Sequence, residues 1–173
     1  MFDKFGEFDS ADEMNRAAAA QLAEGDTAAV LAIAEENGLD KADAEDYIDG
    51  MEPVLASPLM AADGKLTVEA ADIGIREGIL SLWLGQVRQL CAEDPALCIA
   101  VRRQGKRLAE CLASMVQYSF EHKVRVSDKV VNLVKVRHNG KTVPMQKPLY
   151  LGVPDNTQSK NLIREYYLGG DRA

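Results

Sequence analysis

Apolar and polar residues in the first fifty positions fall into short alanine-rich stretches separated by Gly-Asp joints. Ser10 and Glu13 form a capping-box pattern, in which both side chains satisfy backbone donors where a helix begins. Asp26 directly precedes the second stretch and Asp40 the third, so each can cap the start of a helix. The predicted helices cover residues 10–24, 27–36 and 41–49, and the glycines that end them are Gly25, Gly38 and Gly50. The pattern therefore predicts a tight N-terminal module of three helices.

Helical spacing of apolar residues returns after residue 75, most clearly at Ile79, Leu82, Trp83 and Val87. Before that point Pro53 and Pro58 interrupt the pattern, and Asp63-Gly64 is predicted to be a turn. The further predicted helices cover about 76–92, 95–104, 108–123 and 155–169. Asp94-Pro95 opens the second of these, and Gly169-Gly170 ends the last. This part is predicted to be a second, larger helical unit.

Residues 124–148 fit two patterns. Ser127-Asp128 is typical of a helix start, whereas the β-branched residues and Asn139-Gly140 indicate strands on either side of a tight turn. We favour the hairpin. The predicted fold is mainly α, a compact multi-helix protein with at most one small β-hairpin. It would comprise an acidic three-helix module, 1–52, and a basic helical domain, 53–173.

The division into two parts is sharpest in the charges. The chain of 173 residues has a net charge of −7, but residues 1–63 hold 16 Asp+Glu against 3 Lys+Arg, and residues 64–173 hold 11 against 17. The first part is thus −13 and the second +6, which indicates distinct partners, or packing of one part on the other within one chain or across a homodimer. An acidic N-terminus and the absence of any long apolar run predict a cytoplasmic protein without a membrane partner.

Residue types that carry chemistry are sparse. Three cysteines form no CxxC pair, and only His122 and His138 could add imidazole ligands, so the usual zinc spacings are absent. Cys91, Cys98 and Cys111 each fall on an apolar helical face and are predicted to be buried free thiols. No nucleophile and base stand together, so we expect a non-enzymatic protein with no catalytic residue, metal or cofactor.

Five carboxylates are concentrated where the third helix is predicted. On a helical wheel they spread over one half of the circumference, opposite Ala44, Tyr47 and Ile48. They are Asp43, Glu45, Asp46, Asp49 and Glu52. One interpretation is a solvated face that confers solubility. The other is a rigid anionic array that imitates nucleic-acid phosphates and binds a basic partner.

The segment 102–107 is the densest basic stretch. Its Gly-Lys pair suggests a phosphate-binding loop, but Ala100 stands where the first glycine is required and Arg107 where a hydroxyl must bind magnesium. The candidate cationic residues are Arg102, Arg103, Lys106 and Arg107. They could stabilise helix ends, contact the phosphates of duplex DNA, or pack against the acidic module. Farther along, Tyr166 and Tyr167 have the spacing of core residues, with base stacking as the alternative.

Four stretches carry a resemblance to a known group: "FDKFGEFDSADEMN", "LAEENGLDKADAEDYIDG", "QGKRLAECLASM" and "REYYLGG". They resemble small proteins of conjugative elements and phages of gut Firmicutes, a group similar to PcfK-like proteins and to anti-CRISPR proteins that inhibit the type II RNA-guided nuclease. The resemblance implies an inhibitor that binds this nuclease or its guide RNA complex in a bacterial host. A DNA-binding or scaffold accessory protein of such an element is the alternative.

Overall fold

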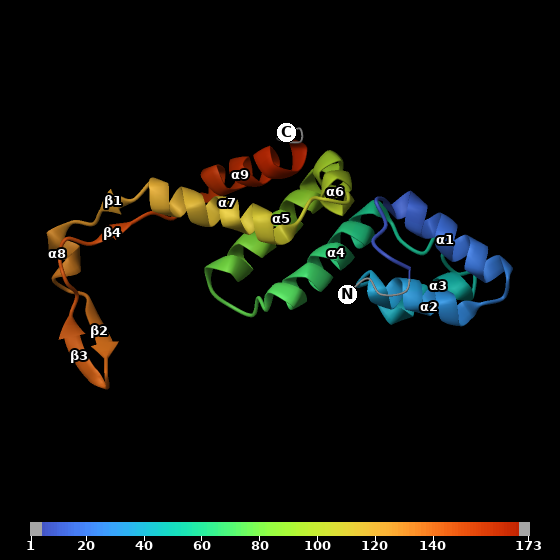
Figure 1. Ribbon diagram of the computed structural model, residues 1–173, viewed down its shortest axis with the longest axis horizontal. Helices are drawn as coiled ribbons and strands as arrows, with labels where there is room; N and C mark the ends of the chain where they lie inside the picture. The colour runs from blue at the N-terminus through green and yellow to red at the C-terminus, as the bar shows by residue number, and fades with distance from the viewer. Residues whose placement is uncertain (1–4, 170–173) are drawn as a thin grey trace.

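The computed structural model describes residues 5–169 and is mainly helical, as predicted (Figure 1). The predicted domain limits at residues 1 and 173, and Gly170 as part of the last helix stop, lie outside the described residues. Over the described part of the chain, no helix is both long and apolar enough to cross a membrane.

Nine helices and four short strands follow one another within residues 5–169. The helices are α1 (Ala11–Ala23), α2 (Thr27–Glu36), α3 (Lys41–Ile48), α4 (Pro58–Ile73), α5 (Ile79–Glu93), α6 (Pro95–Arg102), α7 (Leu108–Glu121), α8 (Asp128–Val131) and α9 (Asn156–Leu168). The strands are β1 (Val124–Arg125), β2 (Lys135–His138), β3 (Lys141–Pro144) and β4 (Tyr150–Leu151). Figure 1 shows an elongated molecule, with α1–α3 at one end and the strands at the other.

The N-terminal helices begin at the predicted capping residues. The Ser10 hydroxyl accepts the N–H of Glu13 at 3.1 Å, while the Glu13 carboxylate accepts the N–H of Asp9, not that of Ser10. Asp26 and Asp40 cap α2 and α3 in the same way. The core shared by these helices is formed by Phe8, Met14, Ala18, Val30, Ile33, Ala44, Tyr47 and Leu55, among others. The predicted three-helix arrangement is therefore present.

Helix α4 corrects the predicted turn at Asp63-Gly64, because both residues lie in the middle of this helix. Ser57 caps it, and Pro58 occupies its first turn, where a proline costs no hydrogen bond. Gly64 is needed for packing and not for a turn: a Cβ atom here would lie 2.2 Å from the carbonyl oxygen of Asn37. The backbone that follows α2 thus crosses α4 at close range.

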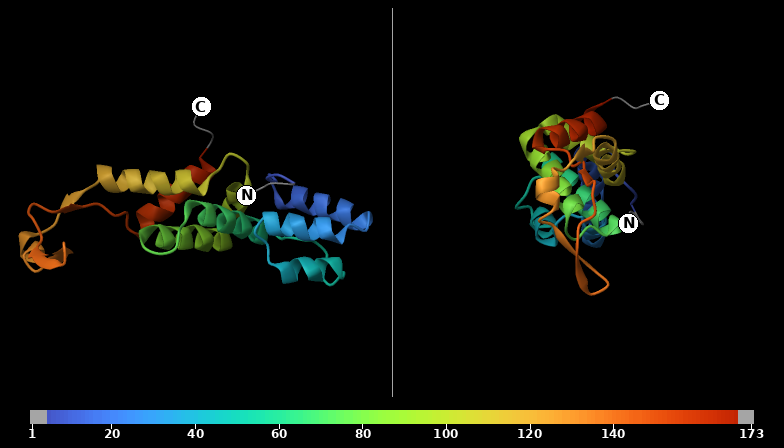
Figure 2. Two further views of the ribbon diagram at one scale, coloured as in Figure 1. Left: turned by 60° about the horizontal axis from the view of Figure 1, so that its bottom comes forward. Right: turned by 90° about the vertical axis from the view of Figure 1, so that its left-hand side faces the viewer.

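The larger unit packs α4–α7 and α9 around a second core (Figure 2). Helix α5 begins three residues later than predicted, since Gly78 has a φ of 82° and serves as its N-cap. Helix α6 ends at Arg102 instead of Gln104. Fully buried side chains of this core include Leu66, Val87, Leu90, Leu97, Leu108, Cys111, Met115 and Ile163.

The two cores meet inside α4. Ala61 belongs to the N-terminal core and Ala62 to the second core, so the helix is shared between them. Leu55 and Ala56 also pack into the N-terminal core, beyond the predicted boundary at residue 52. The larger unit is therefore joined to the N-terminal module by a continuous helix.

Residues 122–153 form a projection, here termed the arm, which leaves α7 and returns to α9. Both patterns predicted for this region are present: α8 is a single helical turn, and β2 and β3 form the hairpin around Asn139-Gly140, both at positive φ. A second two-stranded ribbon, β1 with β4, was not predicted. Figure 1 shows the arm extending away from the helical body, at the end opposite α1–α3.

Candidate interaction surfaces

The N-terminal module presents an almost uniformly acidic exterior, here termed the acidic surface. Among residues 5–56 ten carboxylate residues are exposed, against only two cationic residues, Arg16 and Lys41. The ten are Asp9, Asp12, Glu24, Asp26, Glu35, Asp40, Asp43, Glu45, Asp49 and Glu52. Lys41 is itself paired with Glu45 at 2.5 Å. The surface therefore carries a strong negative field.

Helix α3 carries the predicted acidic array. Ala44 and Tyr47 are buried, as predicted, and this orientation turns Asp43, Glu45 and Asp49 to solvent; Asp46 is half-buried. The helix ends in a Schellman motif, in which the N–H of Met51 donates to the carbonyl of Asp46 and that of Gly50 to Tyr47. Glu52 follows this motif and so lies outside the helix on which the wheel had placed it. It remains exposed on the same module.

A groove of about 560 Å³ lies beside this array, between α4 and the loop leading into α3. Asp40, Asp43 and Asp63 contribute carboxylates to it, and Leu59 and Met60 contribute apolar surface. The eight lining residues are Gly38, Leu39, Asp40, Asp43, Leu59, Met60, Asp63 and Gly64. A lysine or arginine side chain has the matching chemistry, an aliphatic stem with a cationic end.

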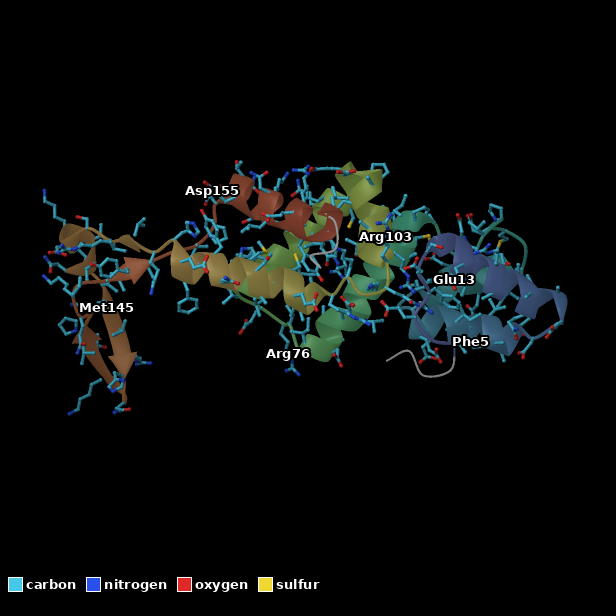
Figure 3. All side chains as sticks on the ribbon, turned by 45° about the horizontal axis from the view of Figure 1, so that its top comes forward. Phe5, Glu13, Arg76, Arg103, Met145 and Asp155 are labelled. Carbon is cyan, nitrogen blue, oxygen red and sulfur yellow. The ribbon has the colours of Figure 1, made fainter. Side chains whose placement is uncertain are left out.

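Most of the cationic side chains of segment 102–107 have partners within the protein. Arg102 is buried and donates to the side-chain oxygen of Asn37. Lys106 donates to the backbone oxygens of Tyr166, at 3.1 Å, and Gly169, at 3.4 Å, at the C-terminal end of α9. Arg103 is exposed (Figure 3), but its carbonyl also accepts a hydrogen bond inside the protein. Helix capping and packing on the acidic module, two of the predicted alternatives, describe this segment.

A buried ionic network joins the two cores. Lys65 pairs with Glu7 at 2.7 Å and donates to the carbonyl of Arg103 at 2.6 Å. Arg107 contacts Glu7 at 2.9 Å and Glu69 at 3.4 Å, and Glu69 also accepts the N–H of Leu108 at 2.7 Å. Sequence reasoning missed this network, because it placed Lys65 after a turn when it lies on the inner face of α4.

Burial perturbs the ionisation of this network. Desolvation lowers the pKa of Lys65, against the opposing effect of the Glu7 carboxylate. Desolvation likewise raises the pKa of Glu69, although the N–H of Leu108 and the charges of Lys65 and Arg107 oppose it. Each charge has a partner, which is what burial of ionised groups requires. The arrangement is that of a structural connection between the two cores.

The C-terminal tyrosines are part of the body, as predicted. Tyr167 is buried in the second core, and its ring meets that of Tyr166 edge-on at 4.8 Å. The Tyr166 hydroxyl accepts the N–H of Arg107 and donates to Glu110, both at 2.7 Å. These hydrogen bonds and the buried position of Tyr167 leave neither ring arranged for base stacking.

Metal-binding groups and cysteines were the chemistry-bearing residue types considered from the sequence. No three His, Cys, Asp or Glu side chains of residues 5–169 lie close enough together to hold a metal ion. All three cysteines are buried and outside disulfides, as predicted. Burial raises the pKa of Cys91 and of Cys111 to about 12 and that of Cys98 also upward, so these thiols stay protonated near neutral pH.

Comparison of the chain with protein-family models, with curated proteins and with solved structures found no match. The resemblance to mobile-element and anti-CRISPR proteins therefore stays a prediction from the four sequence stretches.

Proposed function

We propose that the protein acts without catalysis, by binding a basic protein surface that normally holds nucleic acid. The partner proposed is a type II RNA-guided nuclease or its guide RNA complex, in the cytoplasm of a bacterial host. The observation that carries the proposal is the acidic surface, with ten exposed carboxylate residues against two cationic ones. Nucleases of this kind hold their nucleic acids in positively charged channels, which such a surface complements.

Helix α3 supplies the geometry for this role. Residues three or four apart on a helix have Cβ atoms about 5–6 Å from each other, so Asp43 and Asp46 form a closely spaced anionic pair on a rigid element. Asp43 also borders the groove with Asp40 and Asp63, where a cationic side chain of the partner would find carboxylates and apolar surface together. Binding there would compete with phosphates for the same cationic side chains.

A cleavage assay tests this proposal. Purified protein is titrated into nuclease loaded with guide RNA, before and, separately, after target DNA is added. We expect cleavage to fall to a plateau near one protein per nuclease, with stronger inhibition when the protein is added first. Absence of inhibition across several type II nucleases would refute the proposed partner.

A charge-reversal variant tests the surface. Replacing Asp43, Asp46 and Asp49 by lysine should abolish inhibition while the helical circular dichroism stays unchanged. The matched control reverses three carboxylates of the larger unit, Asp72, Glu77 and Glu121, which are also exposed. It changes the net charge equally but should retain inhibition. If both variants inhibit alike, the acidic face of α3 has no part in binding.

Segment 102–107 does not favour the alternative of a DNA-binding accessory protein. Three of its four cationic side chains are engaged within the protein, by Asn37, by the end of α9 and by Glu7 and Glu69.

A further inference from the structure

The arm holds all of the excess positive charge of the larger unit. Residues 122–153 contain 7 of the 17 Lys+Arg and 1 of the 11 Asp+Glu found in residues 64–173, which leaves ten of each elsewhere. The seven cationic residues, all exposed, are Lys123, Arg125, Lys129, Lys135, Arg137, Lys141 and Lys147. The one acid, Asp128, is held by Arg125, with both oxygens at 3.1 Å. The arm is thus a cationic projection from a larger unit whose other charges balance.

The hairpin gives three of these cations, Lys135, Arg137 and Lys141, a regular placement. Arg137 is paired with Thr142 and Lys135 with Pro144, so these four side chains share one face of the ribbon. The opposite face has Val136 paired with Val143, and His138 with Lys141. Lys141 lies beside the turn. The basic face and the tip are therefore both exposed to solvent.

The base of the arm is fixed to the body. A Cβ atom on Gly152 would lie 2.2 Å from the carbonyl oxygen of Ser119, so the returning chain passes directly against the last turn of α7. The β1–β4 ribbon then carries both chain segments outward, and Val131 of α8 is fully buried. Figure 3 shows Met145 of the arm far from Phe5 and Glu13 at the acidic end. The hairpin is thus held clear of the helical body.

We infer that the arm binds double-stranded DNA, with hairpin β2–β3 placed along the major groove and its cations on the flanking phosphates. A two-stranded β-ribbon fits the major groove of DNA, and neutralising phosphates provides most of the affinity of such contacts. The arm also exposes Leu133, which is 82% accessible, and Tyr150, both able to contact sugars or bases. Because none of these residues belongs to the acidic surface, this binding is independent of the proposed inhibition.

Fluorescence anisotropy of the full chain with a labelled 20-base-pair DNA duplex tests the inference. RNA duplex of the same sequence and the single DNA strand are measured in parallel. The test variant changes Lys135, Arg137 and Lys141 to glutamine. The control changes Arg16, Arg76 and Arg164, which lie outside the arm, to glutamine and so alters the net charge equally. A third variant, Lys135→Arg with Arg137→Lys and Lys141→Arg, retains the charge.

We expect duplex binding by the wild type, the control and the charge-retaining variant. Loss of three phosphate contacts should reduce the slope of log K against log salt concentration by about 2.7 and weaken binding at 50 mM salt at least about tenfold. The DNA duplex should bind more tightly than the RNA duplex, whose narrow major groove does not admit a ribbon, and equal or tighter binding of RNA would overturn the inference. The inference is overturned if no duplex binds, if only the single strand binds, or if the test variant matches the control. It is equally overturned if the test variant loses only self-association, since the arm would then bind the acidic surface of a second copy.

Discussion

Substitution of Gly64 by alanine measures how strongly the two cores depend on their close contact at α4. The added Cβ would lie 2.2 Å from the backbone oxygen of Asn37, whereas ordinary contact begins near 3.4 Å. The carbonyl oxygen of Asn37 belongs to the backbone and cannot rotate away from the added methyl group. Asn37 is also fully buried, and its side chain is hydrogen-bonded to Ile33 and Arg102. Overpacking of this kind costs about 1–3 kcal/mol, and a rigid obstacle places the cost near the upper end.

Helix propensity partly offsets that cost. Alanine is favoured over glycine within a helix by about 1 kcal/mol, so the net loss for Gly64→Ala should be about 2 kcal/mol. For a chain of this size, that corresponds to a fall of roughly 4–8 °C in Tm. The measurement is urea unfolding followed by circular dichroism at 222 nm, with the thermal midpoint as a second readout.

Gly85 provides a matched control, because it lies within α5 and an added Cβ would meet nothing within 4 Å. Gly85→Ala should therefore gain about 1 kcal/mol from propensity alone. The same chemical change should thus have opposite signs at two helical positions. Equal or greater stability of Gly64→Ala relative to the wild type would show that the contact with Asn37 is not tight, and would refute the packing argument.

Further predictions concern the buried charges and thiols. Glu7→Gln should lower the free energy of unfolding by about 3–5 kcal/mol, because Lys65 would remain charged and buried, and adding Lys65→Met should recover part of this in urea unfolding. Burial raises the pKa of Glu69, so between the unfolded and the folded pKa the folded chain holds a proton that the unfolded chain has released. The free energy of unfolding contributed by this group should therefore fall as the pH rises from the ordinary glutamate pKa to the folded one. Glu69→Gln should remove that component from a series of unfolding curves measured at different pH values. The three cysteines should react slowly with a thiol reagent at pH 8 and rapidly in urea; fast labelling of the native protein would contradict their burial.

Local signals in the sequence predicted the helices well where the relevant chemistry is local. The capping residues Ser10, Asp26 and Asp40, and the stop at Gly50, each act within one turn of the chain. The role of Gly64 was predicted wrongly because it depends on tertiary structure. Glycine is required where the backbone at Asn37 crosses the helix, and the spacing of residues in the sequence does not reveal that crossing. The turn prediction at Asp63-Gly64 failed for this reason.

The density of charge along the chain was similarly a poor guide to which cationic side chains are free on the surface of the folded protein. Segment 102–107 is the densest basic stretch, yet three of its cations are used within the fold. The cations of the arm are spaced apart in the sequence, so they form no dense basic stretch there. The fold of the arm brings them onto one projection. A count of charge over 122–153 would have found the excess, had the boundaries of the arm been known.

The separation of charge along the molecule gives it a permanent electric dipole. The acidic surface lies at one end and the cationic arm at the other (Figure 1). In the field of a charged partner such a molecule rotates before contact, so encounters would begin end-first and productive collisions would become more frequent. At physiological ionic strength the Debye length is about 8 Å, so the partner's field turns the molecule only in the final approach. At low salt the field reaches farther and the molecule begins to turn at a greater distance. The shape and charge of the chain therefore set the direction from which each partner is met.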